Sequence, residues 1–427
     1  MLTARKAISV GEAIGKIMRD IRLGDVERMP LNKANGRYLA EGIVANQDVP
    51  AFDRSLYDGY AIKAEDTITA AKESPIEFEV VGHIGAGSVF RGEVKKNQAV
   101  RIMTGAEMPK SCNAIVMLEH VEEIEKEGKH IIAIHKQIPV NEKVFKKGTE
   151  IKEGTLIIRK GARINPGIVG LLATFGYSEV LVGVKPKVGV LATGSELLEV
   201  EEPLVPGKIR NSNSYMLMAQ IEKLGAEPVY LGKLEDDLEK SYTEIVRALK
   251  EVDVLITTGG VSVGDFDYLP EIYNRLDAEV LFNKIAMRPG SVTTVAKLGH
   301  QYLFGLSGNP SASFIGFELF VRPVLKTLLG NGQPYLITHK ANLTEDFPVP
   351  NAFTQLIRTK VKVEGTNVLV SSNGLNMSSS ITSLVGADAL IVLPPSDSGY
   401  KKGSLIDVLL LSDEGQEECF FIGGLEI

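Results

Sequence analysis

Cysteine is scarce in this sequence: its 427 residues include only Cys112 and Cys419. Two cysteines cannot build a disulfide framework, and the interval between them is not the spacing of a metal site. The simplest interpretation is a pair of unpaired thiols in a reducing compartment.

Long apolar runs and basic clusters are missing as well. Residues 1–10 lack the apolar core of a signal peptide, and no run approaches the ~20 apolar residues that span a bilayer. The net charge is -7, and the longest basic clusters are the pairs Lys95-Lys96 and Lys146-Lys147. A nucleic-acid partner would require a concentrated basic face. The sequence therefore predicts a cytoplasmic protein with no membrane span and no nucleic-acid partner.

A helix is predicted near the N-terminus. Ser9-x-x-Glu12 has the pattern of a capping box, in which each side chain satisfies a free backbone N–H of the other residue. Apolar residues from Val10 to Ile21 follow helical spacing, and Gly24 is the predicted C-terminal stop.

The length predicts three or four domains, since domains usually contain about 100–150 residues. Residues 49–145 carry short alternating apolar runs broken by glycines, which predicts a small β-rich domain. A second helix is predicted at 165–176, where a cap residue precedes proline. We expect it to pack with the first helix, so that residues 1–48 and 146–184 form one discontinuous linking domain around the β-rich insertion.

Residues 185–331 alternate strands with helices, whereas residues 332–427 return to a strand pattern. Continuous apolar strands that alternate with helices predict a parallel sheet covered on both faces. The C-terminal residues predict a β-barrel or sandwich with an acidic tail. The expected fold class is multidomain, α/β plus β.

Three glycine-rich turns follow predicted strands of the α/β domain, at residues 193–196, 258–265 and 307–310. In open parallel sheets, ligands bind beyond the carboxyl ends of the strands. Glycine permits close backbone approach, and free N–H groups at helix starts suit phosphate oxygens. One such turn would be weak evidence, but three in one domain predict a site for a phosphorylated small molecule.

Acids and hydroxyls accompany these turns and suggest Mg²⁺ bridging ligand phosphates to protein oxygens. The predicted metal ligands are Asp236, Asp265 and Asp267. An alternative stays open for Asp236 and its neighbour Asp237, which could instead cap the next helix. The other polar residues of these turns are Ser195, Glu196 and Ser262.

Lys284 and Arg288 precede Pro289-Gly290, where cations could neutralise an anionic substrate. A surface salt bridge explains either residue equally well. In the first half of the chain, the pair Asp58-Gly59 would by itself indicate only a turn.

Taken together, these motifs resemble those of one family, in the same order and over nearly the whole chain. The matching segments are Ser55-Leu56-Tyr57-Asp58-Gly59-Tyr60-Ala61, Arg101-Ile102-Met103-Thr104-Gly105-Ala106, Thr193-Gly194-Ser195-Glu196-Leu197, Gly259-Gly260-Val261-Ser262-Val263-Gly264-Asp265 and Gly308-Asn309-Pro310. The family is that of the molybdopterin molybdenumtransferases (MoeA, gephyrin E-domain). Its third domain has the fold of the molybdopterin adenylyltransferase MogA, which resembles residues 185–331 of this chain.

The resemblance implies an elongated homodimer with four domains per subunit. The family inserts molybdenum from molybdate into adenylylated molybdopterin with Mg²⁺ and releases AMP. The dithiolene sulfurs of the ligand, rather than protein cysteines, would take up the metal. A MogA-type adenylyltransferase would supply the substrate. The site would lie between the α/β domain of one subunit and the β-rich domain of the other.

Site residues are implied on the same basis. The catalytic positions would be Asp58, Thr104, Glu179, Ser262 and Asp267, of which Asp58 and Thr104 would reach across the dimer. Molybdate would be held by Arg288 and Ser378. The substrate-binding positions would be Thr193, Gly194, Ser195, Glu196, Asn211, Gly259, Gly260, Gly264, Lys284, Arg288, Pro289, Ser307, Gly308, Asn309 and Pro310.

The chain departs from the family pattern where the family places molybdate. The usual Lys-Pro-Gly-Lys-Pro is here Arg288-Pro289-Gly290-Ser291-Val292, which keeps the first cation and loses the second. The usual Glu-Phe-x-Arg is here 352–355, which ends in Gln355. A dianion needs cations or many N–H donors, so the sequence predicts a molybdate site with fewer cations than usual.

Two alternatives to the molybdenumtransferase reaction remain open from the sequence. One is a non-catalytic paralogue that binds molybdopterin as a carrier, sensor or scaffold. The other is the same enzyme acting on tungsten.

Overall fold

The computed structural model describes residues 6–260, 268–412 and 415–422. The chain forms two compact units: the small unit, residues 42–159, and the large unit, residues 1–41 with 160–427. Within the described residues, no helix is both long enough and apolar enough to cross a membrane. The four domain boundaries expected from the sequence remain predictions.

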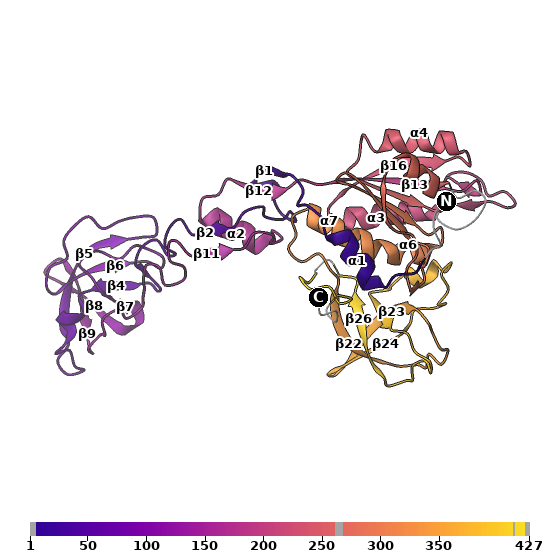
Figure 1. Ribbon diagram of the computed structural model, residues 1–427. Coiled ribbons are helices and arrows are strands. Elements are labelled where there is room, and N and C mark those ends of the chain that lie inside the picture. Colours follow the sequence, from indigo (N-terminus) through magenta and orange to yellow (C-terminus); the bar gives the residue numbers. More distant parts are fainter. Residues whose placement is uncertain (1–5, 261–267, 413–414, 423–427) are drawn as a thin grey trace. The chain divides into compact units, whose positions relative to one another are not determined.

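The small unit is built on a six-stranded sheet in the order β7-β4-β6-β5-β9-β8 (Figure 1). Only the β5–β6 pair is parallel. Alternate residues of these strands belong to two separate hydrophobic cores. One core contains Tyr60 and Phe78, and the other contains Ala61 and Val100. The period of two follows from the pleat of a strand. The strands of the sheet are β4 (Gly59–Ile62), β5 (Ile76–Ile84), β6 (Gln98–Ile102), β7 (Ala114–Met117), β8 (Val121–Lys126) and β9 (Lys129–Ile134).

Short elements complete the small unit and the adjoining part of the large unit. In the small unit, β2 (Ile43–Val44) pairs with β11 (Leu156–Ile158) and β3 (Arg54–Ser55) with β10 (Val144–Phe145). In the large unit, β1 (Val26–Pro30) pairs with β12 (Glu179–Gly183) beside α2 (Pro166–Thr174). Helix α2 begins as predicted, because the Asn165 side chain accepts a hydrogen bond from the backbone N–H of Ile168.

The large unit contains a six-stranded sheet in the order β16-β13-β17-β21-β20-β18. Strands β16, β13, β17 and β21 are parallel, as expected, whereas β20 pairs antiparallel with both of its neighbours, β21 and β18. The sheet is therefore mixed, which corrects the expectation of a parallel sheet. The reason is local: only Gly299 and His300 separate β20 from β21, and a two-residue connection can only form an antiparallel hairpin. The strands are β13 (Lys187–Thr193), β16 (Glu227–Leu234), β17 (Val254–Thr258), β18 (Glu279–Phe282), β20 (Thr294–Leu298) and β21 (Gln301–Leu306).

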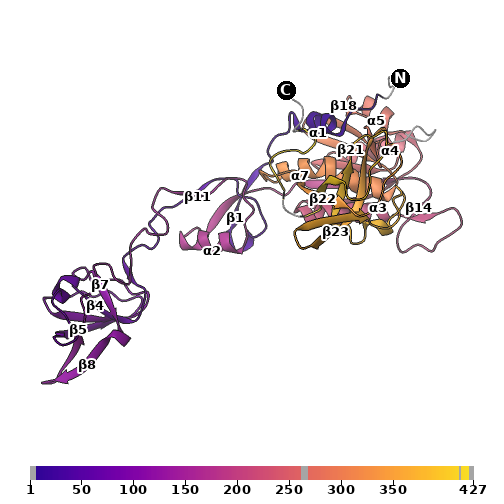
Figure 2. The ribbon, with the colours of Figure 1, turned by 90° about the horizontal axis from the view of Figure 1, so that it is seen from below.

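Helices cover both faces of this sheet (Figures 1 and 2). Val190 and Ile256 point into the core shared with α1, α3, α6 and α7, while Leu191 and Leu255 point into the core under α4 and α5. The result is the three-layer arrangement expected for residues 185–331. The helices are α1 (Val10–Met18), α3 (Ser212–Leu224), α4 (Leu238–Ala248), α5 (Leu269–Arg275), α6 (Pro310–Gly316) and α7 (Arg322–Leu328), with a π-helical turn at Phe317–Val321 joining the last two.

Helix α1 starts as predicted and ends early. The Ser9 hydroxyl accepts a hydrogen bond from the backbone N–H of Glu12 at 3.1 Å, as an N-cap does. The helix ends at Met18, six residues before the predicted stop at Gly24. An ideal Cβ at Gly24 would lie 2.2 Å from the carbonyl oxygen of Leu328, so this glycine serves close backbone packing instead.

The expected packing of the first two helices was wrong. Ala13, Ile14 and Ile17 of α1 belong to the core of the α/β sheet, and Leu172, the buried residue of α2, does not. The apolar stripe was read correctly, but a stripe does not specify its partner.

Residues 337–410 form a closed five-stranded barrel. Strand β22 pairs with β24 and β26, β23 pairs with β24 and β25, and β25 pairs with β26, so the ring has no free edge. A barrel was one of the two forms expected here. Its strands are β22 (Ile337–Leu343), β23 (Thr354–Glu364), β24 (Asn367–Ser372), β25 (Ala389–Leu393) and β26 (Leu405–Leu410), and β19 (Met287–Arg288) extends the sheet beside β23.

The described end of the chain packs against α1, and Gly11 allows this contact. An ideal Cβ at Gly11 would lie 2.2 Å from the carbonyl oxygen of Phe421. Gly11→Ala is expected to displace residues 419–422 and to lower the free energy of unfolding by about 1–3 kcal/mol. Gly15→Ala is the matched control in the same helix, because nothing lies within 4 Å of its Cβ position. It should stabilise by up to ~1 kcal/mol, since alanine is the better helix former. Urea unfolding measures the stability of both variants. Equal stabilities of Gly11→Ala and Gly15→Ala would contradict the close contact between Gly11 and Phe421.

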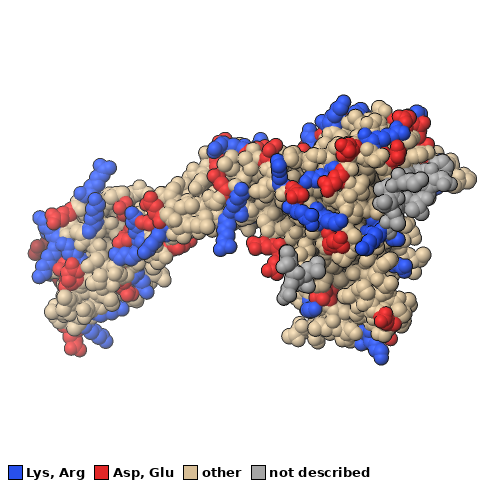
Figure 3. All heavy atoms as spheres, in the orientation of Figure 1, with Lys and Arg blue, Asp and Glu red and all other residues tan. Residues whose placement is uncertain are grey.

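Charges of both signs are interspersed over the visible faces of both units (Figure 3). Most described ion pairs, such as Lys126–Glu77 and Lys340–Asp407, join partly exposed side chains. Such pairs contribute little to stability, about 0–1 kcal/mol each.

Candidate active site

Three glycine-bearing turns meet at the carboxyl ends of β13, β17 and β21, which are neighbours in the sheet. The Thr193 hydroxyl donates to the carbonyl oxygen of Thr258 at 3.2 Å, and the backbone N–H of Gly259 donates to the carbonyl oxygen of Leu306 at 3.0 Å. An ideal Cβ at Gly308 would lie 3.7 Å from the Cα of Gly259. The structure therefore brings the described parts of the three predicted turns together.

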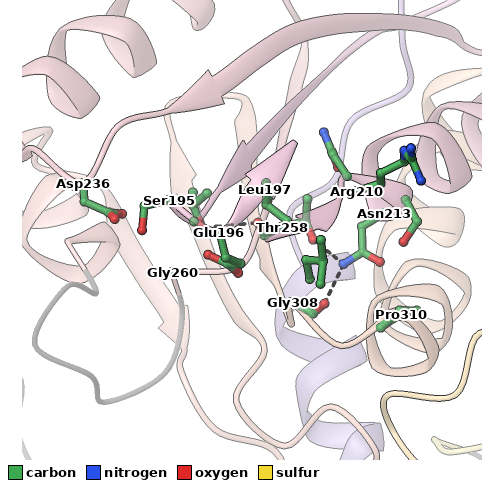
Figure 4. A pocket seen from close by; sticks show the side chains of 16 residues that line it. Ser195, Glu196, Leu197, Arg210, Asn213, Asp236, Thr258, Gly260, Gly308 and Pro310 are labelled. Carbon is green, nitrogen blue, oxygen red and sulfur yellow. Dashed lines mark hydrogen bonds between the residues drawn. The ribbon is translucent and has the colours of Figure 1, made fainter. Parts of the chain in front are cut away.

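A cavity of about 320 Å³, cavity 1, opens at these turns (Figure 4). Its size is at the lower end of the range for small-molecule sites, roughly 300–1,000 Å³. Ten of the residues singled out from the sequence line it. They are Thr193, Gly194, Ser195, Glu196, Asn211, Asp236, Gly259, Gly260, Gly308 and Pro310.

One wall of cavity 1 is formed by β14 (Leu197–Leu198), β15 (Ile209–Arg210) and the loop that joins them. Tyr230 fixes both ends of this segment, because its hydroxyl donates to Glu199 at 2.8 Å and accepts from the Asn211 amide at 3.1 Å. Burial and the hydrogen bond to Glu199 raise the pKa of Tyr230, so the phenol stays protonated and donates. Asn211 also caps α3 by accepting from the backbone N–H of Ser214. Asn211 therefore lines the predicted site and also stabilises the start of α3.

Asn213 was missed by the sequence analysis and lies at the opposite end of the cavity from Asp236 in Figure 4. Its Nδ2 donates to the Thr258 hydroxyl at 2.9 Å and to the carbonyl oxygen of Gly308 at 2.8 Å. Because a carbonyl oxygen only accepts, the amide orientation is determined. Asn213 thus ties two of the three turns together. The signal available in the sequence was a polar residue on the first turn of a helix beside a predicted site.

The two neighbouring acids behave differently. Asp237 accepts a hydrogen bond from the backbone N–H of Lys240 and caps α4, as the alternative interpretation held. Asp236 does not cap the helix; it lines cavity 1 together with Glu196, and in Figure 4 it lies at the same end as Ser195. The predicted metal and catalytic residues Ser262, Asp265 and Asp267, and the predicted substrate-binding Gly264, lie outside the described residues.

The donors of cavity 1 suit a magnesium ion that also binds substrate phosphate. Mg²⁺ commonly uses one or two carboxylates and keeps several waters, and cavity 1 offers Asp236 and Glu196. No group of three or more His, Cys, Asp or Glu side chains within the described ranges converges as a metal cluster. A magnesium ion here would therefore depend on ligand oxygens or on the stretch 261–267.

A second cavity of about 380 Å³, cavity 2, lies on the other side of the turn 307–310. Along this turn Ser307 and Asn309 face cavity 2, whereas Gly308 and Pro310 face cavity 1. The residues predicted as one substrate set are thus divided between two cavities that share a wall. Arg288, Pro289 and Ser378 line cavity 2.

Arg288 forms no salt bridge with any described residue, so of the two roles weighed from the sequence the surface salt bridge is not the one observed. Its guanidinium lies 5.6 Å from the ring centre of Phe353, a cation–π contact, rather than in a salt bridge. Ser378 is fixed through its backbone, because its carbonyl oxygen accepts from the N–H of Ser311 at the start of α6. Gln355, which stands where the family has arginine, also lines the cavity.

Cavity 2 contains a second cation, Arg358, that the sequence analysis missed. The side chain is 2% exposed and donates to the carbonyl oxygens of Leu375 and Met377, the Asn376 amide oxygen and the Ser383 hydroxyl. Burial lowers its pKa, but a guanidinium stays charged in proteins. Arg358 therefore holds the loop that carries Ser378 and offsets, in charge, the arginine absent at position 355.

Arg358→Met is expected to lower molybdate affinity at least about tenfold, because the loop at 375–383 loses its anchor and the cavity a charge. Arg322→Met is the matched control: Arg322 is equally buried, at 1%, but it bonds Glu318 and Ser412 and does not line cavity 2. Molybdate titration of both variants, below their unfolding temperatures, separates the two. Equal losses of affinity would contradict the assignment.

Two predicted residues lie outside both cavities. Lys284 is half-buried, and its carbonyl oxygen accepts from the backbone N–H of Ile8. Glu179 begins β12 on the surface of the large unit, opposite Pro30. The catalytic role predicted for Glu179 stays a prediction.

The small unit holds the remaining two predicted residues, and they are in direct contact. Asp58 Oδ1 accepts two hydrogen bonds from Thr104, one from the backbone N–H and one from the hydroxyl, both at 2.8 Å. The two sequence motifs are also joined through backbone bonds between Ser55 and Gly105 and between Ser55 and Ala106. The contact was not derivable from either motif alone.

The hydrogen bonds from Thr104, with a smaller contribution from the charge of Arg101, hold the pKa of Asp58 below its usual range. Asp58 is therefore a partly exposed carboxylate anion at neutral pH. Within the described part of the chain, its second oxygen, Oδ2, has no hydrogen-bond partner. This oxygen is available to a ligand or a metal.

Comparisons with known proteins agree with this arrangement. Residues 8–176 match the MoeA N-terminal region (domain I and II), residues 189–327 a probable molybdopterin binding domain, and residues 340–411 the MoeA C-terminal region (domain IV). A molybdopterin molybdenumtransferase of Bacillus subtilis is 50% identical over 418 residues, which are 98% of this chain and 97% of the relative.

The chain belongs to the molybdopterin molybdenumtransferase (MoeA) family.

Other members of the family are similarly close. The molybdopterin molybdenumtransferase of Staphylococcus epidermidis is 48% identical over 97% of this chain and 98% of its own length. Among solved structures, a molybdopterin biosynthesis MoeA protein from Pyrococcus horikoshii has a TM-score of 0.83 at 31% identity and covers 96% of this chain and 100% of that chain. Membership of the MoeA family and the predicted fold class are therefore confirmed.

Proposed function

We propose that this protein is a molybdopterin molybdenumtransferase of molybdenum cofactor biosynthesis. It takes adenylylated molybdopterin and molybdate as substrates and releases AMP. The observation that carries the proposal is the pair of cavities that share the turn 307–310, because the reaction must bring a pterin nucleotide and an oxyanion together. The close full-length relatives are named as molybdopterin molybdenumtransferases.

Cavity 1 takes the adenylylated pterin. The backbone N–H groups of its glycine turns suit phosphate oxygens, and Asn213 keeps two of these turns in register. Asp236, with Asp265 and Asp267, would hold Mg²⁺, which would supply positive charge to neutralise the phosphates. The protein's own contribution is to fix the phosphoanhydride relative to the sulfur atoms that receive molybdenum.

Cavity 2 takes molybdate. Arg288 at its rim and Arg358 in its wall supply two positive charges, and Ser378 supplies a hydroxyl. Water cleaves the phosphoanhydride and AMP leaves. The dithiolene sulfurs, which take no part in that bond, replace two oxygens of the neighbouring molybdate, and these oxygens leave as water. The shared turn at 307–310 explains how the two substrates come within reach of each other.

The site is completed by a second subunit. Asp58 and Thr104 of the partner's small unit face the phosphates bound in cavity 1, and the protein works as a homodimer. A MogA-type adenylyltransferase delivers the substrate. We place the protein in the cytoplasm, where it needs neither a membrane nor a nucleic acid for the reaction.

The direct test uses purified protein, adenylylated molybdopterin, molybdate and Mg²⁺, with the Bacillus subtilis relative assayed in parallel. AMP should appear in step with active cofactor. If the relative releases AMP and this protein does not, the proposal fails.

The same assay decides between the alternatives. A carrier, sensor or scaffold would bind molybdopterin tightly in calorimetry and yet release no AMP. A tungsten-using variant would show faster cofactor formation with tungstate than with molybdate at equal concentrations.

A further inference from the structure

Arg101 of the small unit forms a polar cluster that no role described above uses. It lies on β6 directly across from Tyr60 of β4. Its Nη1 donates to the Tyr60 hydroxyl at 3.1 Å and to Glu123 at 3.3 Å, and its guanidinium carbon lies 5.7 Å from the centre of the Tyr60 ring. Tyr60 in turn donates to Glu123 at 2.7 Å. The guanidinium is therefore held from two sides.

Tyr60 is the rigid member of this cluster. The Tyr60 side chain is fully buried in the core of the sheet, and only its hydroxyl reaches the cluster. Burial and the carboxylate of Glu123 raise the pKa of Tyr60 to about 12, so the phenol stays protonated. It can then donate to Glu123 and accept from Arg101 at the same time. Glu123 is shared further with His130, at 3.4 Å.

The strand register places Arg101 beside Asp58. Asp58 directly precedes β4 and lies two residues before Tyr60, and its carbonyl oxygen accepts from the backbone N–H of Leu118 at 3.4 Å, which extends the β4–β7 register by one residue. Arg101 is opposite Tyr60 and lies at the diagonal position from Asp58. Diagonal neighbours have Cβ atoms roughly 7–8 Å apart, which a long side chain can bridge. The field of Arg101 indeed acts on the carboxylate of Asp58.

Arg101 is only partly used by the protein. A guanidinium has five N–H donors, and both hydrogen bonds of Arg101 to described residues involve Nη1. The edge formed by Nε and Nη2 has no partner in the described ranges, and the side chain is 31% exposed. This edge has the geometry that binds two oxygens of a phosphate or a similar oxyanion.

We propose that Arg101 is a substrate-binding residue whose free Nε–Nη2 edge takes two oxygens of a tetrahedral oxyanion at the Asp58–Thr104 site. The inference rests on the proposed function and deepens it. The oxyanion is either the phosphate of the adenylylated substrate or molybdate; the two share the same tetrahedral arrangement of anionic oxygens.

A plain surface ion pair with Glu123 is the competing explanation. Such a pair would need neither the buried hydroxyl of Tyr60 nor a free donor edge. It also makes a different prediction, because loss of a surface ion pair changes stability slightly and substrate affinity not at all.

The experiment uses the full-length protein with Arg101→Met, Arg101→Lys and the control Lys129→Met. Lys129 is a cation of the same sheet, paired with Glu79 at 2.9 Å and remote from the Asp58 motif in the sequence. AMP and molybdate are titrated separately by calorimetry, and KM and kcat are measured for AMP release. Unfolding temperatures of all variants are compared.

The expected result for Arg101→Met is an approximately tenfold rise in Kd for one of the two anions and in the matching KM. A change with AMP assigns the phosphate, and a change with molybdate assigns the metal oxyanion. Arg101→Lys should keep part of the affinity, since lysine provides a charge without the paired donors. Lys129→Met should bind as the unchanged protein does.

Unaltered Kd and KM values in Arg101→Met overturn the inference, as does a lower kcat accompanied only by a lower unfolding temperature. Failure of the proposed function looks different. The unchanged protein would then release no AMP at all, while the two anion titrations would still report whether Arg101 binds an oxyanion.

Discussion

Asp58→Ala is expected to reduce the rate of AMP release at least about 100-fold, the range typical for loss of a group that acts directly on the reacting centre. The physical reason is that Asp58 is an ionised carboxylate with one oxygen held by Thr104 and the other open to a ligand. Initial rates of AMP release at saturating molybdate and Mg²⁺ measure the effect. Thr104→Val, which keeps the backbone N–H and removes the hydroxyl bond, should cost about tenfold.

Asp66→Ala is the matched control. Asp66 lies in the same unit, and its carboxylate also accepts a hydrogen bond from a backbone N–H, that of Asn97 at 2.9 Å. Its removal should leave the rate within about twofold, since a surface substitution away from the site rarely matters. A comparable loss in both variants would show that the small unit is simply destabilised, and the role of Asp58 would be lost.

Gly259→Ala should have the other large effect, on cavity 1. Gly259 has φ +93°, and an ideal Cβ there would lie 2.5 Å from the Thr193 hydroxyl and 2.7 Å from the Thr193 carbonyl oxygen. The added methyl group must push apart two of the turns that form the cavity. We expect AMP affinity to fall at least about thirtyfold, together with a loss of roughly 2–4 kcal/mol in the free energy of unfolding.

Gly225→Ala is the control that separates the steric clash of Gly259→Ala from the strain of a left-handed alanine. Gly225 ends α3 with the same φ, +93°, but nothing lies within 4 Å of its Cβ position. This variant should lose only about 1–2 kcal/mol of stability, the cost of a left-handed alanine, and should bind AMP normally. If both variants bind AMP equally well, the turn at Gly259 does not shape the nucleotide site.

The same two substitutions test whether the protein is a homodimer whose sites are each shared by two subunits, as proposed. A subunit with Asp58→Ala retains cavity 1, and a subunit with Gly259→Ala retains the small-unit residues. If the site spans two subunits, each mixed dimer has one intact site, and random mixing restores roughly a quarter of the activity. No recovery on mixing, with exchange verified by mass, would place all residues of a site within one chain.

The sequence by itself determined the local features of this protein, because they depend on neighbouring residues. The side chains of Ser9 and Asn165 cap their helices, because each accepts a hydrogen bond from the backbone N–H three residues later. Gly225, in the left-handed conformation, ends α3 as glycine commonly ends a helix. The strand ends that carry the glycine turns, and the ordered motifs by which the family was recognised, are likewise stretches of consecutive residues.

The tertiary structure alone decided which distant groups meet. Asn213 and Gly308 are 95 residues apart, and their hydrogen bond exists only because the first turn of α3 lies beside the turns that follow β17 and β21. The buried Arg358 became part of cavity 2 through the loop it anchors. The turn 307–310 became a wall between two cavities. Such contacts follow from how layers pack, and a periodic pattern states that a face is buried without naming its partner.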